Sequence, residues 1–132
     1  MRYYHDKHFS VREAREVLAR LRPHIERMVA LARRLEASGF NIHLRQYRFG
    51  WHPDTLGPYP PEFHELVEII QRLHRAGVLV KGVEEGLVDF PHLRADGEEV
   101  YLCWKLGEPE LAYWHPLDTG FAGRQPLEET GG

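Results

Sequence analysis

The chemically versatile residues of this chain gather in its last third, between Gly86 and Arg124, which also holds the only cysteine. Several of them carry oxygen, nitrogen or sulfur donors of the kinds that bind zinc-like or iron-like ions. These candidates are Asp89, His92, Cys103, Glu108, His115 and Asp118. His115 and Asp118 are three residues apart and converge if the chain turns after Pro116. We therefore predict a site for a divalent transition metal at the end of a sheet, with His115, Asp118 and Glu108 as ligands.

Two observations weigh against this metal site. The chain lacks Cys-x-x-Cys and His-Glu-x-x-His, the spacings typical of zinc sites. Strand alternation also puts His115 on the opposite sheet face from Cys103, which disfavours a Cys–His pair. A cysteine nucleophile with a histidine base is an alternative. Cys103 falls in the middle of a predicted strand, however, so a buried structural thiol is the favoured interpretation.

The sheet itself suggests a second kind of site. If the predicted hairpins keep their apolar residues paired, one face carries the side chains that pack on the helices. Those residues are Val88, Phe90, Val100, Leu102, Trp104, Leu106, Leu111 and Tyr113. The opposite face and the tail then supply the predicted ligand-binding residues, Asp89, Cys103, Lys105, Trp114 and Arg124. We expect a small anionic ligand or a protein partner there, unless Arg124 only pairs with Asp89 or Glu108 and pins the tail.

The helices and strands that position these residues are predicted from the spacing of apolar residues and from the positions of glycine and proline. A capping box at Ser10 begins a helix that ends at Ser38-Gly39, with Pro23 as a kink because the apolar spacing stays in phase across it. A second helix runs from about 60 to Gly77, and residues 40–60 form a long loop. Strands are predicted at 78–83, 87–90, 100–106 and 111–115. The expected fold is α+β, an antiparallel helix pair on a small antiparallel sheet of three to four strands.

Composition sets the class of protein. The chain has 132 residues, 42% of them hydrophobic, and a net charge of -3. We expect one domain: a helical part at about 10–77, a β part at 78–115, an ordered loop at 116–127 and a frayed tail at 128–132. Nucleic acid is an unlikely partner at this charge, and no apolar run is long enough for a membrane span. We predict a cytoplasmic protein and, from the apolar surface left over, a homodimer.

Four stretches of the chain resemble a small bacterial family, Domain of Unknown Function 2203. They are FSVREAREVL near the start, then GLVDFP, EVYLCWKLGE and YWHPLDTGFAGRQPL. The resemblance implies no activity and assigns no catalytic residue. We therefore predict a small binding or assembly module that uses the polar and aromatic sheet face, because no ligand set or nucleophile arrangement has a recognised spacing. The alternative is a hydrolase-like metal-dependent enzyme with a His and carboxylate site at the sheet end.

Overall fold

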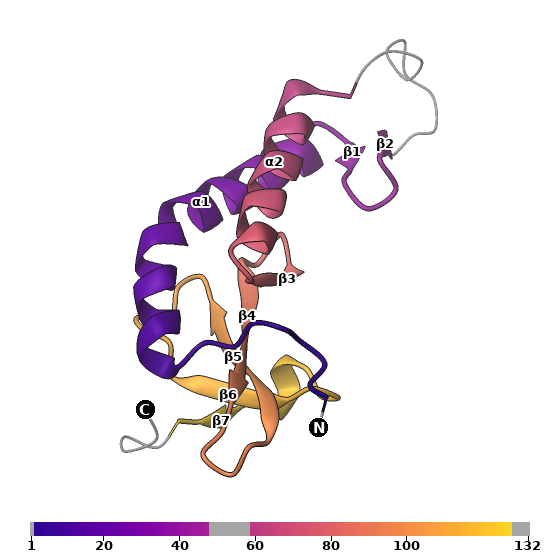
Figure 1. The fold of residues 1–132 in the computed structure, drawn as a ribbon. Coiled ribbons are helices and arrows are strands. Elements are labelled where there is room, and N and C mark those ends of the chain that lie inside the picture. Colours follow the sequence, from indigo (N-terminus) through magenta and orange to yellow (C-terminus); the bar gives the residue numbers. More distant parts are fainter. Residues whose placement is uncertain (1, 48–58, 128–132) are drawn as a thin grey trace.

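The computed structural model describes residues 2–47 and 59–127, and its two helices stand over one face of an antiparallel sheet (Figure 1). The helices are α1 (Val11–Ala37) and α2 (Pro61–Arg75), with a 3₁₀ turn η1 (Phe121–Gly123). The strands are β1 (Phe40–Asn41), β2 (Gln46–Tyr47), β3 (Leu79–Gly82), β4 (Leu87–Leu93), β5 (Glu99–Lys105), β6 (Tyr113–Pro116) and β7 (Gln125–Pro126). The predicted α+β class and helix pair are confirmed. Within these described residues, no helix is long and apolar enough to cross a membrane.

Helix α1 begins as its capping box predicts. The Ser10 hydroxyl accepts from the Glu13 amide at 3.0 Å, while the Glu13 carboxylate accepts from the Ser10 amide at 2.9 Å. The helix continues through Pro23 as one element, and its ribbon bends along its length (Figure 1). Proline removes one backbone donor, so a bend is the expected outcome where packing keeps both halves helical. The prediction of one kinked helix is correct.

Helix α2 runs back along the upper half of α1, so the two form an antiparallel pair (Figure 1). Arg27 and Glu65 join them at the surface with two hydrogen bonds of 2.8 and 2.9 Å. Gly77, just beyond α2, has a φ of +89°, the left-handed conformation that lets the chain leave a helix without a Cβ clash. The chain then enters β3 and the main sheet.

One core joins the helices to the sheet. The largest of its fully buried side chains come from α1, from α2, from alternate positions of β4 and β5, and from the segment before β6. They are Trp104, Phe90, Ile25, Met28, Leu31, Leu35, Leu66, Leu73, Leu102 and Leu111. The core face of β4 and β5 is the one that the alternation predicts. The opposite face of β4 and β5 does not pack on the helices, so a functional site can lie there.

The main sheet has five strands in the order β3-β4-β5-β6-β7, all antiparallel, rather than the expected three to four. The additional strand β7 is two residues long and lies in the predicted loop at 116–127, where it pairs with Tyr113 and Trp114 of β6. A strand so short has no periodicity of its own. Pairing with a neighbour is what makes it a strand.

Strand β4 also runs further than its sequence indicates. Pro91 was expected to end it after Phe90, yet the strand continues to Leu93. On one side β5 pairs with it throughout, and on the other side β3 pairs only as far as Asp89. Beyond that point the N-terminal segment lies alongside, with the Phe9 amide donating to the Pro91 carbonyl at 2.7 Å. Proline therefore loses no sheet hydrogen bond here.

The long connection between the helices is described in part. Its first residues form a small hairpin, because β1 pairs with β2 through Phe40–Tyr47 and Asn41–Gln46. Arg45, in the turn, has a positive φ of 57°. Residues 48–58, predicted as loop, and residues 128–132, predicted as a frayed tail, lie outside the described residues.

Candidate metal centre

The faces of β6 are opposite to the prediction. Tyr113 pairs with Cys103 and His115 pairs with Tyr101, so these four side chains share one face of the sheet. Trp114 pairs with Leu102 on the core face instead. The alternation was counted from buried Leu111, but β6 begins only at Tyr113 and the backbone between them is irregular. A slip of one residue moves every side chain of a strand to the other face.

This register brings three donors together. Asp89 of β4, Cys103 of β5 and His115 of β6 lie on neighbouring strands and point from the same face. One donor atom of each lies within 4.8 Å of the other two. All three side chains are buried, with exposed fractions of 1%, 1% and 2%. A carboxylate oxygen, a thiol sulfur and an imidazole nitrogen form a set that zinc and related ions accept.

Asp89 is the least satisfied member of this cluster. Its Oδ2 lies 3.0 Å from His115 Nε2, but its buried Oδ1 has no hydrogen-bond partner. The Cys103 thiol interacts with the carboxyl group without giving Oδ1 a hydrogen bond of ordinary geometry. Burial raises the pKa of Asp89, and His115 offsets only part of that rise. An unpaired buried carboxylate oxygen is costly, which makes this atom a marker for a missing partner.

The protonation of His115 follows from its other nitrogen. Nδ1 lies 2.8 Å from the carbonyl oxygen of Pro116, and a carbonyl can only accept. Nδ1 therefore carries a proton, and in the neutral ring the lone pair is on Nε2, facing Asp89. A backbone carbonyl that fixes the second nitrogen is the usual support for a metal-bound histidine.

Cys103 is a protonated thiol in this setting. Burial and the Asp89 carboxylate together raise the pKa of Cys103 to about 12, although an Arg124 nitrogen lies 3.8 Å from the sulfur. A thiol that stays protonated at neutral pH is a poor nucleophile. Both His115 nitrogens are also engaged with other partners. The arrangement is therefore unlike a nucleophilic triad, in which histidine faces the nucleophile with one nitrogen and the carboxylate with the other.

A C-terminal clamp covers one side of the cluster. Arg124 donates to the Glu108 carboxylate through both terminal nitrogens, with Nη1 3.0 Å from Oε1. Its guanidinium carbon lies 3.9 Å from the centre of the Tyr113 ring and 4.2 Å from that of Phe121. Of the two pairings anticipated for Arg124, the one with Glu108 is present. The clamp holds the predicted loop across the end of the sheet.

The N-terminal segment covers the other side. The Glu99 carboxylate accepts from the backbone amides of Tyr4 and His5 at 2.7 and 2.9 Å and lies 2.7 Å from His8 Nε2. His5 Nε2 lies 2.7 Å from the hydroxyl of Tyr101. The Tyr101 ring in turn packs against His115, with ring centres 5.5 Å apart. The N-terminal segment and the Arg124 region thus lie on two sides of the cluster.

The profile of one family matches residues 7–127, which is most of the chain. It is described as an uncharacterized conserved protein family, DUF2203. The chain belongs to this family. Neither a curated protein nor a solved structure matches it. The resemblance noted in the sequence is therefore confirmed, and it brings no activity with it.

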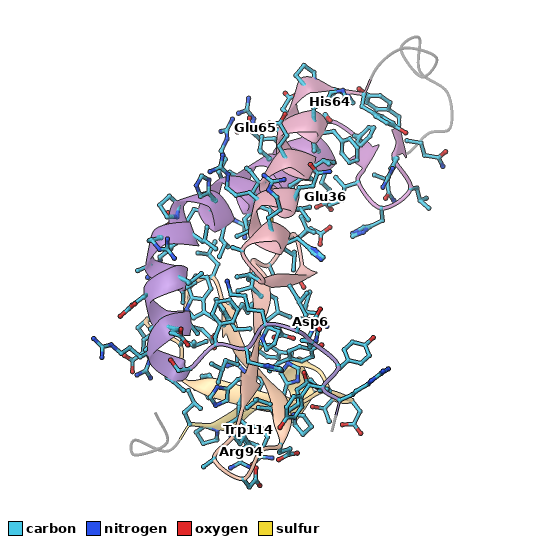
Figure 2. All side chains as sticks on the ribbon, viewed as in Figure 1. Asp6, Glu36, His64, Glu65, Arg94 and Trp114 are labelled. Carbon is cyan, nitrogen blue, oxygen red and sulfur yellow. The ribbon has the colours of Figure 1, made fainter. Side chains whose placement is uncertain are left out.

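The other predicted ligands of this DUF2203 chain lie elsewhere. Glu108 is occupied by Arg124, and Lys105 has its amine 5.4 Å from the centre of the Phe121 ring. The chain does turn after Pro116, but the turn leaves Asp118 exposed. Trp114 packs against the core from its edge, with Arg94 stacked on it at 4.1 Å; Figure 2 labels both. Of the three predicted metal ligands, only His115 joins the cluster.

His92, the remaining candidate, lies on the core face. Its Nδ1 is 2.7 Å from the Phe9 carbonyl oxygen, and it contributes nothing to the cluster. Sequence reasoning gave no role to His5 or Lys81 in this region. Both residues lie near Tyr101 because of the path of the N-terminal segment and the pairing of β3 with β4. No local sequence motif predicts either arrangement.

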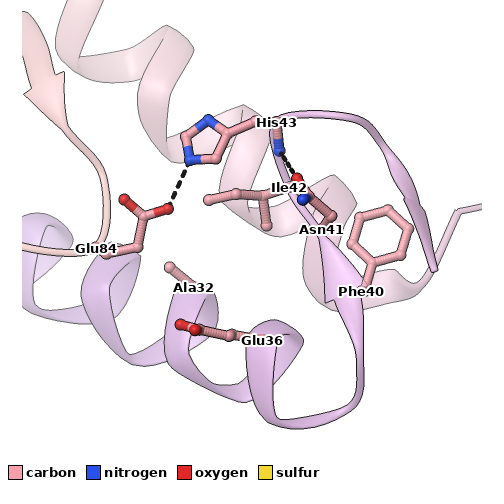
Figure 3. Close-up of a pocket in the computed structure, with 7 residues that line it drawn as sticks. All are labelled: Ala32, Glu36, Phe40, Asn41, Ile42, His43 and Glu84. Atoms are coloured by element: carbon pink, nitrogen blue, oxygen red, sulfur yellow. Dashed lines mark hydrogen bonds and ion pairs between the residues drawn. The ribbon is translucent and has the colours of Figure 1, made fainter. Parts of the chain in front are cut away.

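The chain also has a hollow of about 360 Å³ at the far end of α1 (Figure 3). α1, β1 and the turn after β3 line it, and His43 Nε2 lies 2.8 Å from a Glu84 carboxylate oxygen across its mouth. None of the three clustered donors lines this hollow. His43 and Glu84 are already paired with each other, and Glu36 is the other carboxylate in the lining; among the described residues, a cluster of three such donors is found at Asp89, Cys103 and His115.

Proposed function

We propose that this protein binds a divalent transition metal ion, with Zn²⁺ as the best match, through Asp89, Cys103 and His115. The observation that carries the proposal is the buried, unpartnered Oδ1 of Asp89, a residue of the cluster in which three donors converge. A metal ion would supply that missing partner. It would also replace the proton that must otherwise lie between His115 Nε2 and Asp89 Oδ2.

The dimensions fit such an ion. Neighbouring donors in a tetrahedral zinc site lie about 3.3–3.6 Å apart, and the three donors here lie within 4.8 Å of one another. Modest rotation of buried side chains therefore suffices. The charges fit as well, because a carboxylate and a thiolate together neutralise a divalent ion. Burying the Asp89 carboxylate without a cation costs several kcal/mol, so a cation beside it favours binding, while Cys103 must lose its proton to become the second anion.

Three protein ligands leave one coordination position for water or a substrate. Structural zinc sites are usually closed by four protein ligands, whereas catalytic sites keep a position open. We infer that the metal acts as a Lewis acid, which supports the hydrolase-like alternative over the binding-module prediction. The binding module relied on Trp114 and a free Arg124. Trp114 lies on the core face, and Arg124 is held by Glu108.

The test is elemental analysis of untagged protein together with four substitutions. Wild-type protein should contain close to one transition metal per chain, and Cys103→Ala and His115→Ala should lose it. Cys103→Ala removes only the sulfur from a buried position and leaves the Asp89–His115 hydrogen bond in place, so it should fold. Asp118→Ala, on an exposed turn, and His92→Gln, on the core face, should keep the metal. Metal-free wild type after growth and refolding with Zn²⁺, or full retention in Cys103→Ala, would refute the proposal.

The cytoplasmic location and the homodimer remain predictions. The termini cover part of the sheet face that suggested a dimer, and large apolar side chains stay exposed at Tyr3, Tyr4 and Phe121. Sedimentation velocity across a concentration series distinguishes a monomer near 15.5 kDa from a dimer.

A further inference from the structure

The proposed metal ion would face away from the sheet. Asp89, Cys103 and His115 come from three neighbouring strands and share one face, so all three would bind an ion from its sheet side. The open coordination position then lies on the side of the covering segments. Which ligand that position accepts depends on the charged side chains that lie near the three donors.

Those groups are cations. Arg124 lies beside Cys103, and Lys81 acts electrostatically on Asp89. The two cations differ in one respect. Arg124 is balanced by two hydrogen bonds from its guanidinium to Glu108, whereas Lys81 forms no ion pair with any carboxylate of residues 2–47 and 59–127. The positive charge of Lys81 is therefore available.

Lys81 is also held in position toward the cluster. It leaves the edge strand β3 at a bulge, between Val80 and Gly82, where the register shifts. Its amine lies 4.7 Å from the centre of the Tyr101 ring, and that ring packs on His115. An aromatic face attracts an ammonium group and limits the directions it samples. The bulge thus accompanies the placement of the Lys81 amine over Tyr101, the ring that packs on the proposed ligand His115.

We propose, on the basis of the metal centre above, that its open position takes an oxyanion, the carboxylate or phosphate group of a small molecule, with Lys81 as the partner of its negative charge. A divalent ion bound by Asp89 and a Cys103 thiolate has no net charge, and Glu108 balances Arg124. Glu99, the other carboxylate on this face, is bonded to the Tyr4 and His5 amides and to His8, so Lys81 is the cation left without a carboxylate partner in the described part of the cluster's surroundings. An anionic oxygen can bind the metal and this ammonium together, which neither could achieve as well alone.

The experiment uses the full chain loaded with Co²⁺, whose visible spectrum reports its coordination. Acetate and inorganic phosphate are titrated separately at constant ionic strength. One of them should change the spectrum saturably, and Lys81→Met should weaken that binding at least tenfold. Lys81→Arg should restore most of it. Lys7→Met serves as the matched control, because Lys7 also lies over an aromatic ring, that of Phe9, outside the cluster.

The outcomes separate the two proposals. No cobalt bound through a thiolate would refute the metal centre and this inference together. Cobalt bound normally, with a spectrum that neither anion alters, would refute the oxyanion site alone. Equal anion affinity in wild type and Lys81→Met would also refute it. A Lys81-dependent change with acetate but not phosphate, or the reverse, would support the site and identify which oxyanion it accepts.

Discussion

Asp89 and His115 are 26 positions apart and lie on strands that do not touch, yet their side chains meet at 3.0 Å. Strand β5 runs between them, and Cys103 projects from β5 at that point. The carboxylate and the imidazole thus reach toward each other across the cysteine. Three residues on three strands form one compact donor set because the sheet places Cys103 opposite Asp89, and His115 two residues along the same face, opposite Tyr101.

Metal affinity should rise with pH. The pKa of Cys103 is about 12 in the metal-free protein, so at neutral pH the bound thiolate must release a proton. Displacing this proton alone makes the apparent Zn²⁺ affinity increase about tenfold per pH unit, and displacing the proton between His115 Nε2 and Asp89 Oδ2 as well makes the increase steeper. Competition titrations with a chromophoric chelator between pH 6.5 and 8.5 measure this slope. A flat profile would mean that Cys103 is not a ligand.

Zinc should stabilise the folded chain. A ligand at one hundred times its Kd adds about 2.7 kcal/mol to the free energy of unfolding. For a chain of this length that corresponds to a rise in Tm of roughly 10 °C. Scanning calorimetry with Zn²⁺ and with a chelator measures the difference. Cys103→Ala provides the comparison, because it should fold and show no zinc-dependent rise.

Replacing Trp114 by alanine should destabilise the monomer and leave its oligomeric state unchanged. The indole is part of the packing around the core and carries Arg94 on its face. Because it is only half-buried, a loss of about 2 kcal/mol is expected, below the roughly 3–5 kcal/mol of truncating a fully buried aromatic side chain. Urea unfolding measures the loss. Tyr4→Ala, at an 81% exposed residue, should change stability by less than about 0.5 kcal/mol. Comparable effects of the two variants would contradict this packing role.

The N-terminal segment should loosen in acid. Desolvation raises the pKa of Glu99, but hydrogen bonds from His8, His5 and Tyr4 outweigh it and hold this pKa below its ordinary value of 4.5. A lowered folded-state pKa means that this stabilisation is complete above about pH 4.5 and is lost as pH falls through the folded value. Below that pH, the Tyr4 and His5 amides should become fast in hydrogen exchange.

A substitution tests the same contact at neutral pH. Glu99→Ala should speed exchange of those two amides, because both donate to the Glu99 carboxylate. Glu98→Ala is the matched control, since Glu98 is the exposed neighbour and its side chain bonds only to Arg94 among the described residues. Unchanged protection in Glu99→Ala would show that the segment is held by other contacts.

Local signals alone determined much of this architecture. The capping box at Ser10, the in-phase apolar spacing across Pro23 and the glycine after α2 each depend on neighbouring residues, and each appears as predicted. The same holds for the apolar faces of β4 and β5, because alternation within one strand is a local property. Asp89 and Cys103 were therefore placed on a common face correctly.

Only the tertiary structure decided where His115 points and what surrounds it. The irregular backbone at Leu111 and Ala112 reverses the faces of β6 relative to the predicted ones. Counting alternate residues along the sequence cannot detect such a shift. The contacts of Lys81 and of His5 with Tyr101 join segments 20 and 96 positions apart. Pairing across a sheet depends on the whole fold. The sequence therefore identified the candidate donor residues, whereas the pairing of β4, β5 and β6 decided which of them come together.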